Sequence, residues 1–213
     1  MAKQRAPNRR ENYRHGDLHR ALLEVGTDLA RAGGPDAVVL REVTRQAGVA
    51  PNAAYRHFAD RQALLEAVCA VAQSALAVAM EAKLDKVGSE SDPTEAARAR
   101  LRALGTGYMQ FAQAEPGLFR TAFSVPVDLR SAADSARAGN TGLTPFQILT
   151  GALDGLVETG VISRERRTGA EFLAWSAVHG LAVLLIDGPL RSLDALQSQN
   201  IGQRLLDMVD RGL

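Results

Sequence analysis

The segment REVTRQAGVAPNAAYRHF, from Arg41 to Phe58, constrains the fold more than any other part of this 213-residue chain. Apolar or small residues repeat at helical spacing over 40–47, and Gly48 can adopt the left-handed conformation that ends a helix. Pro51 follows three residues later and fits the first turn of another helix, where its missing N–H costs nothing. The segment therefore predicts two short helices joined by a tight turn.

A helix is expected on each side of this pair. Before it, four apolar residues spaced by four, three and four positions mark one helix face over 18–29, and the sequence Gly-Gly-Pro at 33–35 ends that helix. After it, Ala54 and Phe58 share an inner face, and Asp60 can cap a helix that begins at Arg61. Residues 15–62 are expected to form a compact helical head.

The rest of the chain also has helical patterning. An alanine-rich helix is expected over 61–87, and the helices after it are expected at 94–114, 116–123, 144–159, 168–187 and 198–212. Residues 124–144 are the least regular stretch, with room for a short helix within a loop. No alternating apolar run is long enough to predict a sheet.

Charge and composition narrow the class of protein. Residues 1–66 carry eleven Lys or Arg against eight Asp or Glu, whereas the remainder carries 14 against 16. A basic front end suits phosphate contact, although a solvated basic tail has the same composition. The single cysteine, Cys69, excludes an intrachain disulfide. The charged N-terminus does not resemble a secretory signal, and the apolar stretch 172–186 is shorter than the roughly 20 residues of a membrane span. A cytoplasmic protein with no membrane partner is therefore expected.

Two short helices around a glycine turn are the helix-turn-helix arrangement, in which the second helix enters the major groove of DNA. Pro51, Asn52 and Ala53 would form its compact tip, and the Asn52 amide can pair with adenine. Tyr55 and His57 can reach phosphates. The same turn also occurs in plain helical bundles, where Tyr55 would only pack.

Arginines flank the predicted tip. Arg41 lies at the beginning of the first short helix, where a long cation can reach a guanine, and Arg45 lies one turn later. Arg61 begins the following helix, near the same DNA backbone. The candidate DNA-binding residues are therefore Arg41, Arg45, Pro51, Asn52, Ala53, Tyr55, His57 and Arg61.

These residues carry a family resemblance. The stretches YRHGDLHRALLEVGTDLA and LREVTRQAGVAPNAAYRHFADRQALLEAV resemble the DNA-binding head of TetR-family transcriptional regulators. In AWSAVHGLAVLLIDG, the residues Trp175, His179 and Gly180 are similar to the Trp-His-Gly C-terminal domain of one branch, as is YMQFAQAEPGLFRTAFS to its central region. The resemblance implies a homodimeric repressor that binds a palindromic operator in double-stranded DNA and is released when a small-molecule effector occupies its body.

Three positions depart from the family pattern. Ala50 stands where serine or threonine is common, so the recognition helix lacks a side-chain cap. Ala54 replaces a larger residue, and Arg61 stands where lysine is usual. The implied organisation is all-α: a flexible basic arm over 1–14, a three-helix DNA-binding head with a helix-turn-helix over 15–62, and a C-terminal helical ligand-binding and dimerisation bundle over 63–213.

Most aromatic residues of a helical bundle belong to its core, but two clusters place a polar residue beside aromatic rings. GLFRTAF contains Arg120, and FLAWSAVHG contains His179 one helical turn after Trp175. Arg120 and His179 are candidate polar anchors in an apolar cavity, although His179 suits helix packing equally well. The candidate ligand-binding residues are Met109, Phe119, Arg120, Phe123, Phe146, Trp175 and His179.

The last two helices are the candidate dimer interface. Ile201, Leu205, Met208 and Val209 fall on one face, so a helix pair from each subunit would form a four-helix interface. The alternative is that these helices only close the core of the monomer.

Other classes of protein fit less well. The sequence contains no nucleophile elbow, phosphate loop or paired cysteines, so no enzyme, cofactor or metal site is expected. His15 and His19 are four residues apart but have no acidic or cysteine partner in a metal-binding pattern. An effector-independent activator or architectural protein would share the head. A helical dimer that binds only small molecules would not need the cations Arg41, Arg45, Arg56 and Arg61.

Overall fold

The computed structural model describes residues 15–88, 90–126 and 134–213, and throughout these ranges the regular structure is helical, without strands. The predicted all-α fold class is confirmed, while the predicted basic arm over 1–14 lies outside the described residues. In chain order the elements are α1 (His15–Gly33), η1 (Pro35–Ala37), α2 (Leu40–Ala47), α3 (Pro51–Ala54), α4 (Arg61–Leu84), α5 (Pro93–Ala114), α6 (Pro116–Ala122), η3 (Ser135–Arg137), α7 (Pro145–Glu158), α8 (Arg164–Arg167), α9 (Ala170–Ile186) and α10 (Ala195–Gly212).

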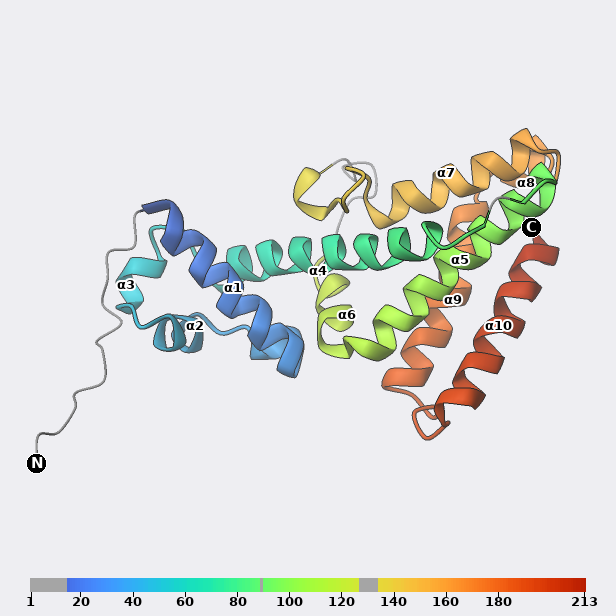
Figure 1. The fold of residues 1–213 in the computed structure, drawn as a ribbon. Coiled ribbons are helices and arrows are strands. Elements are labelled where there is room, and N and C mark those ends of the chain that lie inside the picture. Colours follow the sequence, from blue (N-terminus) through green and yellow to red (C-terminus); the bar gives the residue numbers. More distant parts are fainter. Residues whose placement is uncertain (1–14, 89, 127–133) are drawn as a thin grey trace, which may run out of the picture.

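The head consists of α1, α2 and α3 and lies at one end of the elongated molecule (Figure 1). Gly48 ends α2 with φ of 70°, a left-handed conformation that suits glycine. Ala54 and Phe58 are buried, as their spacing predicted. Asp60 caps α4, since its Oδ1 accepts the N–H of Ala63 at 2.8 Å. The predicted turn, the helix starts and the inner face of the head are all present.

Helix α4 runs from the head into the body and is the central helix of the molecule (Figure 1). It packs against α1, α5, α6 and α7. By length and composition α4 could cross a bilayer. The sequence-based expectation concerned only the shorter apolar stretch 172–186. Much of the apolar surface of α4 is covered, however, and Leu64, Val68 and Leu76 are completely buried in the core. We therefore interpret α4 as a core helix.

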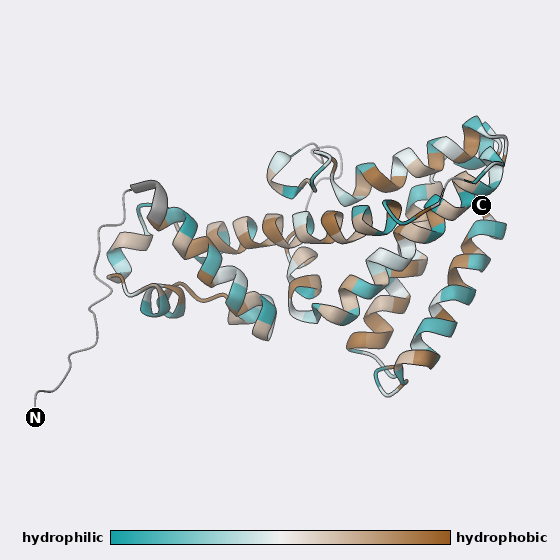
Figure 2. Ribbon diagram, viewed as in Figure 1, coloured by the Kyte–Doolittle hydropathy of each residue, from teal (hydrophilic) through white to brown (hydrophobic). Residues whose placement is uncertain are grey.

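The body is a helical bundle in which α5 packs against α4, α7, α9 and α10, and apolar residues are frequent along α4 and α9 (Figure 2). Helix α6 lies between the body and α1. A Cβ at Gly117 of α6 would lie only 2.3 Å from the carbonyl oxygen of Arg31 and 2.4 Å from that of Ala30. Arg31 also bonds to Glu115 at 3.1 Å. The glycine and the ion pair therefore hold the body closely against the head.

The helices differ from the sequence-based expectation at the end of α4, which is Leu84 instead of residue 87, at α8 and at the start of α10. Helix α8 spans four residues, too few to show apolar periodicity, and it forms because the Ser163 hydroxyl accepts the N–H of Arg166. Helix α10 begins three residues earlier than expected because Asp194 and Gln197 form a reciprocal capping box. The expected boundary between head and body, between residues 62 and 63, falls within the first turn of α4. This helix is therefore shared by the head and the body.

Candidate DNA-binding surface and ligand cavity

The start of α3 forms an exposed tip on the head. Pro51 and Asn52 are exposed, and Ala53 is half-buried. Ala50 provides no side-chain cap, as its lack of a hydroxyl predicted. Tyr55 is 57% exposed although it is a large aromatic residue, and His57 is half-buried beside it. An exposed tyrosine next to a small polar tip is suited to contact with a partner.

The three predicted arginines have different surroundings. Arg41 is exposed at the start of α2. Arg45 bonds to Glu42, with 2.8 Å between Nε and Oε2, and this bond, followed by one from Gln46, lowers the pKa of Glu42 to about 2. Arg61 donates to the carbonyl oxygens of Val38 and Pro35, both at 2.8 Å. Arg45 and Arg61 thus already have partners within the head, and their DNA contacts stay predictions.

His19 of α1 packs against the end of the recognition segment, residues 51–58, which contains the predicted DNA-reading helix and the residues after it. Its ring stacks on Phe58 at a centroid distance of 4.8 Å and meets the edge of His57 at 6.0 Å. The sequence offered His19 only as one of two histidines at metal-binding spacing. Within the part of the chain that the structure describes, no group of three or more potential metal ligands occurs. For His19 the structure shows a packing role that the spacing alone could not reveal.

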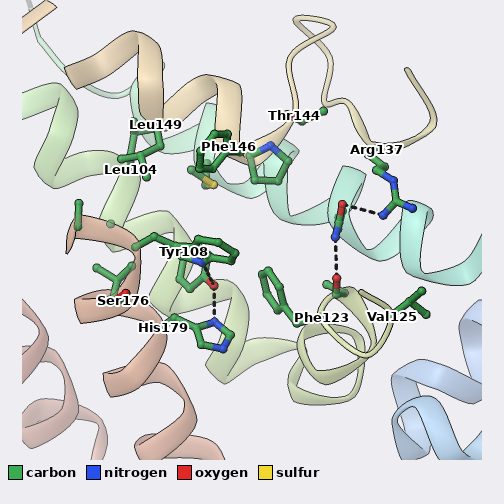
Figure 3. Close-up of a pocket in the computed structure, with 18 of the residues that line it drawn as sticks. Leu104, Tyr108, Phe123, Val125, Arg137, Thr144, Phe146, Leu149, Ser176 and His179 are labelled. Atoms are coloured by element: carbon green, nitrogen blue, oxygen red, sulfur yellow. Dashed lines mark hydrogen bonds between the residues drawn. The ribbon is translucent and has the colours of Figure 1, made fainter. Parts of the chain in front are cut away.

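The body encloses a cavity of about 450 Å³, within the range of about 300–1,000 Å³ that is common for small-ligand sites. Its walls come from α4, α5, α6, α7, α9 and the segment before α7 (Figure 3). The lining is mainly apolar or aromatic. It consists of Gln73, Met80, Leu104, Gly105, Tyr108, Ala122, Phe123, Val125, Pro126, Arg137, Thr144, Pro145, Phe146, Leu149, Ala174, Trp175, Ser176, Val178 and His179.

Three aromatic side chains form a hydrogen-bonded chain at one wall. The Tyr108 hydroxyl lies 3.1 Å from Nε1 of Trp175 and 2.7 Å from Nδ1 of His179. Because the indole N–H can only donate, the Tyr108 hydroxyl accepts from Trp175. Burial lowers the pKa of His179 and so favours its neutral form, in which Nδ1 and the Tyr108 hydroxyl share one hydrogen bond. Burial also raises the pKa of Tyr108. The wall is polar but uncharged.

The opposite wall contains a cation. Gln73 of α4 donates to the carbonyl oxygen of Ala122 at 2.7 Å and accepts from Nη1 of Arg137 at 3.0 Å. Arg137 is largely buried, and its Nε lies 3.3 Å from the carboxylate of Asp134. Gln73 thus joins α4 to α6 and to η3 (Figure 3).

A buried carboxylate holds the segment between η3 and α7 against α4. Glu81 is 5% exposed and accepts the backbone N–H groups of Asn140 at 2.8 Å and Thr141 at 3.0 Å. A Cβ at Gly139 would lie 2.5 Å from the same carboxylate, so only glycine fits there. Two turns earlier on α4, Ser74 donates to the carbonyl oxygen of Ala138 at 2.6 Å. These bonds fix the segment that supplies Arg137 to the cavity.

Four of the seven predicted ligand-binding residues line the cavity: Phe123, Phe146, Trp175 and His179. Arg120 does not, and its expected role as a polar anchor inside the cavity must be corrected. Its Nε donates to the carboxylate of Asp187 at 2.9 Å, outside the cavity. The residue of α6 that lines the cavity is Ala122, and Arg120 lies on another side of that helix. The charged lining residue is instead Arg137.

Phe119 and Met109 also lie outside the lining. Phe119 is buried behind the wall and meets the ring of Tyr108 edge-on at 5.4 Å. Met109 is buried against Gly202 of α10. Residues missed by sequence reasoning include Tyr108, Gln73 and Arg137. The helical spacing of Tyr108 among apolar residues could have indicated that it faces the interior. No such pattern was available for Arg137, which lies in the irregular stretch 124–144.

The outer face of α9 and α10 exposes apolar residues. Leu173, Val183 and Leu184 are exposed on α9, and Ile201 and Met208 are exposed on α10. Leu205 and Val209, the other two residues of the predicted face, are half-buried and pack in part against the core.

An exposed helix-turn-helix tip joined by one helix to a cavity-bearing helical body is the architecture of a DNA-binding transcriptional regulator. Comparison with known families places it more narrowly. The sequence model described as "Bacterial regulatory proteins, tetR family" matches residues 22–68, and that described as "Tetracyclin repressor-like, C-terminal domain" matches residues 101–209, including the Trp-His-Gly motif. The chain belongs to the TetR family of transcriptional regulators.

Solved structures share this fold. A protein with unknown function from Rhodococcus sp. RHA1 has 28% sequence identity and a TM-score of 0.71, over 94% of this chain and 97% of that one. A putative TetR-family regulator from Shewanella sp. PV-4 has 18% identity and a TM-score of 0.59, over 89% and 96%. The Bacillus subtilis regulator FadR, solved in complex with stearoyl-CoA, has 13% identity and a TM-score of 0.63, over 92% and 99%. No curated protein matches the chain.

Proposed function

We propose that this TetR-family protein is a homodimeric repressor of nearby genes in the cytoplasm, released from a palindromic operator when a small molecule occupies its cavity. The observation that carries the proposal is the course of α4. The helix begins at Arg61 beside the recognition segment, and twelve residues later it places Gln73 in the cavity wall. A change at the cavity therefore has a rigid route to the head.

DNA binding is supported by the exposed tip of α3. Asn52 offers an amide to base edges, and two exposed residues flank it: Tyr55, suited to a phosphate, and Arg41, suited to a guanine. A two-fold dimer would place two such tips about 34 Å apart, one turn of duplex DNA. An operator with two inverted half-sites follows from that symmetry.

Dimerisation is supported by the apolar outer face of α9 and α10. Leu173 is 67% exposed, which is costly for an isolated monomer and ordinary for a subunit interface. Gly180 lies on the same face of α9, and a Cβ there would meet no other atom within 4 Å. The glycine leaves room for the close approach of a second chain. Pairing of α9 and α10 with their symmetry copies would bury this face in a four-helix interface.

Release by a ligand follows if the occupied cavity favours a different position of α4. A ligand can shift this equilibrium only by as much as it prefers one state over the other. The B. subtilis regulator solved with stearoyl-CoA shows that a protein of this fold holds a small molecule. The size and lining of the cavity support the same kind of role here.

The proposal is tested by selecting random duplex DNA with the purified, ligand-free protein. We expect enrichment of an inverted repeat, a mass in solution of two chains, and affinity that falls steeply as salt rises. Enrichment of a single half-site by a monomer would contradict the dimeric operator. A reporter gene placed behind the selected operator then separates repression from activation. An activator or architectural protein would bind the same DNA without lowering expression.

A further inference from the structure

We propose that the ligand of the cavity is a largely apolar molecule with a single carboxylate, and that Arg137 binds this carboxylate. The inference rests on the proposed function, because it names the class of molecule that would control the head. It derives from the charge balance of the cavity wall and not from the likeness to other regulators.

The Arg137 guanidinium has little compensation for a charge in its position. Its side chain is 14% exposed, and its one carboxylate partner among the described residues, Asp134, is itself 45% exposed and contacts only Nε. The other acceptors, Gln73 Oε1 at 3.0 Å and Cys69 Sγ at 3.7 Å, are uncharged. A mostly buried cation normally has a close anionic partner, since removal from water is expensive.

The buried carboxylate of the adjacent turn is already used. Glu81 accepts two backbone N–H groups and the hydroxyl of Thr141, so it holds the adjacent turn and does not neutralise Arg137. Nη2 of Arg137 makes no hydrogen bond with the residues that the structure describes. Nη2 therefore has donors available for a carboxylate, and the two-point contact that a carboxylate makes with arginine would also engage Nη1 or Nε.

The rest of the lining limits the ligand to one negative charge. Arg137 is the only Lys or Arg among the described lining residues, and His179 is neutral in its bond with Tyr108. One cation balances a carboxylate but not the several charges of a nucleotide. The remaining wall is formed largely by the rings and chains of residues such as Phe123, Phe146 and Leu149, which suit an apolar body. Figure 3 shows Arg137 and the Tyr108–His179 pair on opposite sides of Phe123.

Binding at Arg137 also has a direct connection to α4. The carboxylate would compete with Gln73 for the same guanidinium, and Gln73 is the side chain that joins α4 to the Ala122 carbonyl of α6. Loss of the Arg137–Gln73 bond would loosen the junction of α4, α6 and η3. The proposed anion site is therefore placed where occupancy alters the helix that leads to the head.

Trp175 makes the test direct, because it is the only tryptophan of the chain and lines the cavity. Its fluorescence is titrated with decanoate and 4-phenylbutyrate, with the primary amide of each, and with decanoyl-CoA. We expect at least one carboxylate to bind about tenfold or more tightly than its amide. If the apolar acid is recognised only as its thioester, decanoyl-CoA alone binds, and the proposed single-carboxylate class is wrong.

The variants Arg137→Gln and Arg137→Lys test the residue, and Arg120→Gln is the matched control outside the cavity. We expect Arg137→Gln to abolish the preference for carboxylate over amide, Arg137→Lys to restore part of it, and Arg120→Gln to leave it unchanged. Thermal melting of each variant checks that the fold is intact. Should Arg137→Lys be as deficient as Arg137→Gln, the arginine would have a structural role and the proposal would fail.

Operator binding, measured on the same preparations, separates this proposal from the proposed function. Amides that bind as tightly as carboxylates and still weaken operator binding would overturn the anion site and leave the ligand-released regulator standing. If no carboxylate changes Trp175 fluorescence, the anion site is overturned, whereas selection of the operator remains an independent result.

Discussion

The head and the body of this protein carry their functional residues in different ways. In the head, the exposed tip comes from one short segment, in which Gly48 ends a helix and Pro51 begins the next. In the body, the cavity is assembled from side chains of six segments that lie up to about a hundred residues apart. A local site is specified by neighbouring residues, whereas a cavity depends on which face of each helix turns inward. The two parts meet along α4 and at the contact of α6 with α1.

The largest expected effect is at the contact between head and body. Gly117→Val would force a side chain against the backbone carbonyls of Ala30 and Arg31, which cannot move as a flexible side chain can. We expect a loss of about 3 kcal/mol in the free energy of unfolding, the upper range for overpacking. Chemical denaturation measures it.

Gly151→Ala is the control for this substitution. Gly151 is an exposed residue within α7, and a Cβ there meets nothing within 4 Å, so we expect a gain of roughly 0.5–1 kcal/mol. Equal effects of the two substitutions would show that head and body are not held together at Gly117.

The second effect concerns the wall of the cavity. Glu81→Ala would leave the N–H groups of Asn140 and Thr141 without their buried acceptor, and we expect a loss of about 2–3 kcal/mol. Glu66→Ala, on an exposed part of the same helix, removes only a 3.1 Å contact with Gln62 and should change stability by less than about 0.5 kcal/mol. Thermal melting distinguishes them. A Glu81→Ala protein as stable as Glu66→Ala would refute the anchoring role of Glu81.

The third effect is confined to the head. Asn52→Ala should weaken binding to the selected operator by about tenfold and relax the base preference at one position of each half-site. Arg45→Ala should cost less than about threefold, because its guanidinium is already paired with Glu42. Fluorescence anisotropy with labelled duplex measures both. A greater loss for Arg45→Ala would mean that the pair with Glu42 opens on DNA.

The smallest effect is a pH dependence in the body. Burial lowers the pKa of His179 below that of the unfolded chain, so the unfolded state binds the proton more readily. Stability from this group is complete above about pH 6.5 and declines as the pH falls below it. We expect the melting temperature of the natural protein to fall more between pH 7 and pH 5 than that of His179→Gln. Parallel declines would show that His179 is not the group responsible.

The sequence predicted the head more fully than the body for physical reasons. Helix-ending glycine, a proline at a helix start and the Asp60 cap are local rules, and each is present as expected. Arg120 illustrates where local rules end, since its neighbours in sequence enter the cavity wall while it pairs with Asp187 outside. The charged residue that does line the cavity, Arg137, lies next to a segment held by Glu81 and Ser74 of α4. Such contacts between residues distant in sequence leave no periodic pattern from which they could be predicted.

The central claim is that the body controls the head through α4, and operator affinity with the cavity occupied tests it most directly. The compound that binds most tightly by Trp175 fluorescence is added at saturation while the protein is titrated against its selected operator. We predict that operator affinity falls by at least about tenfold, or 1.4 kcal/mol of coupling. If affinity is unchanged with every compound that saturates Trp175, the cavity does not control DNA binding and the account is contradicted.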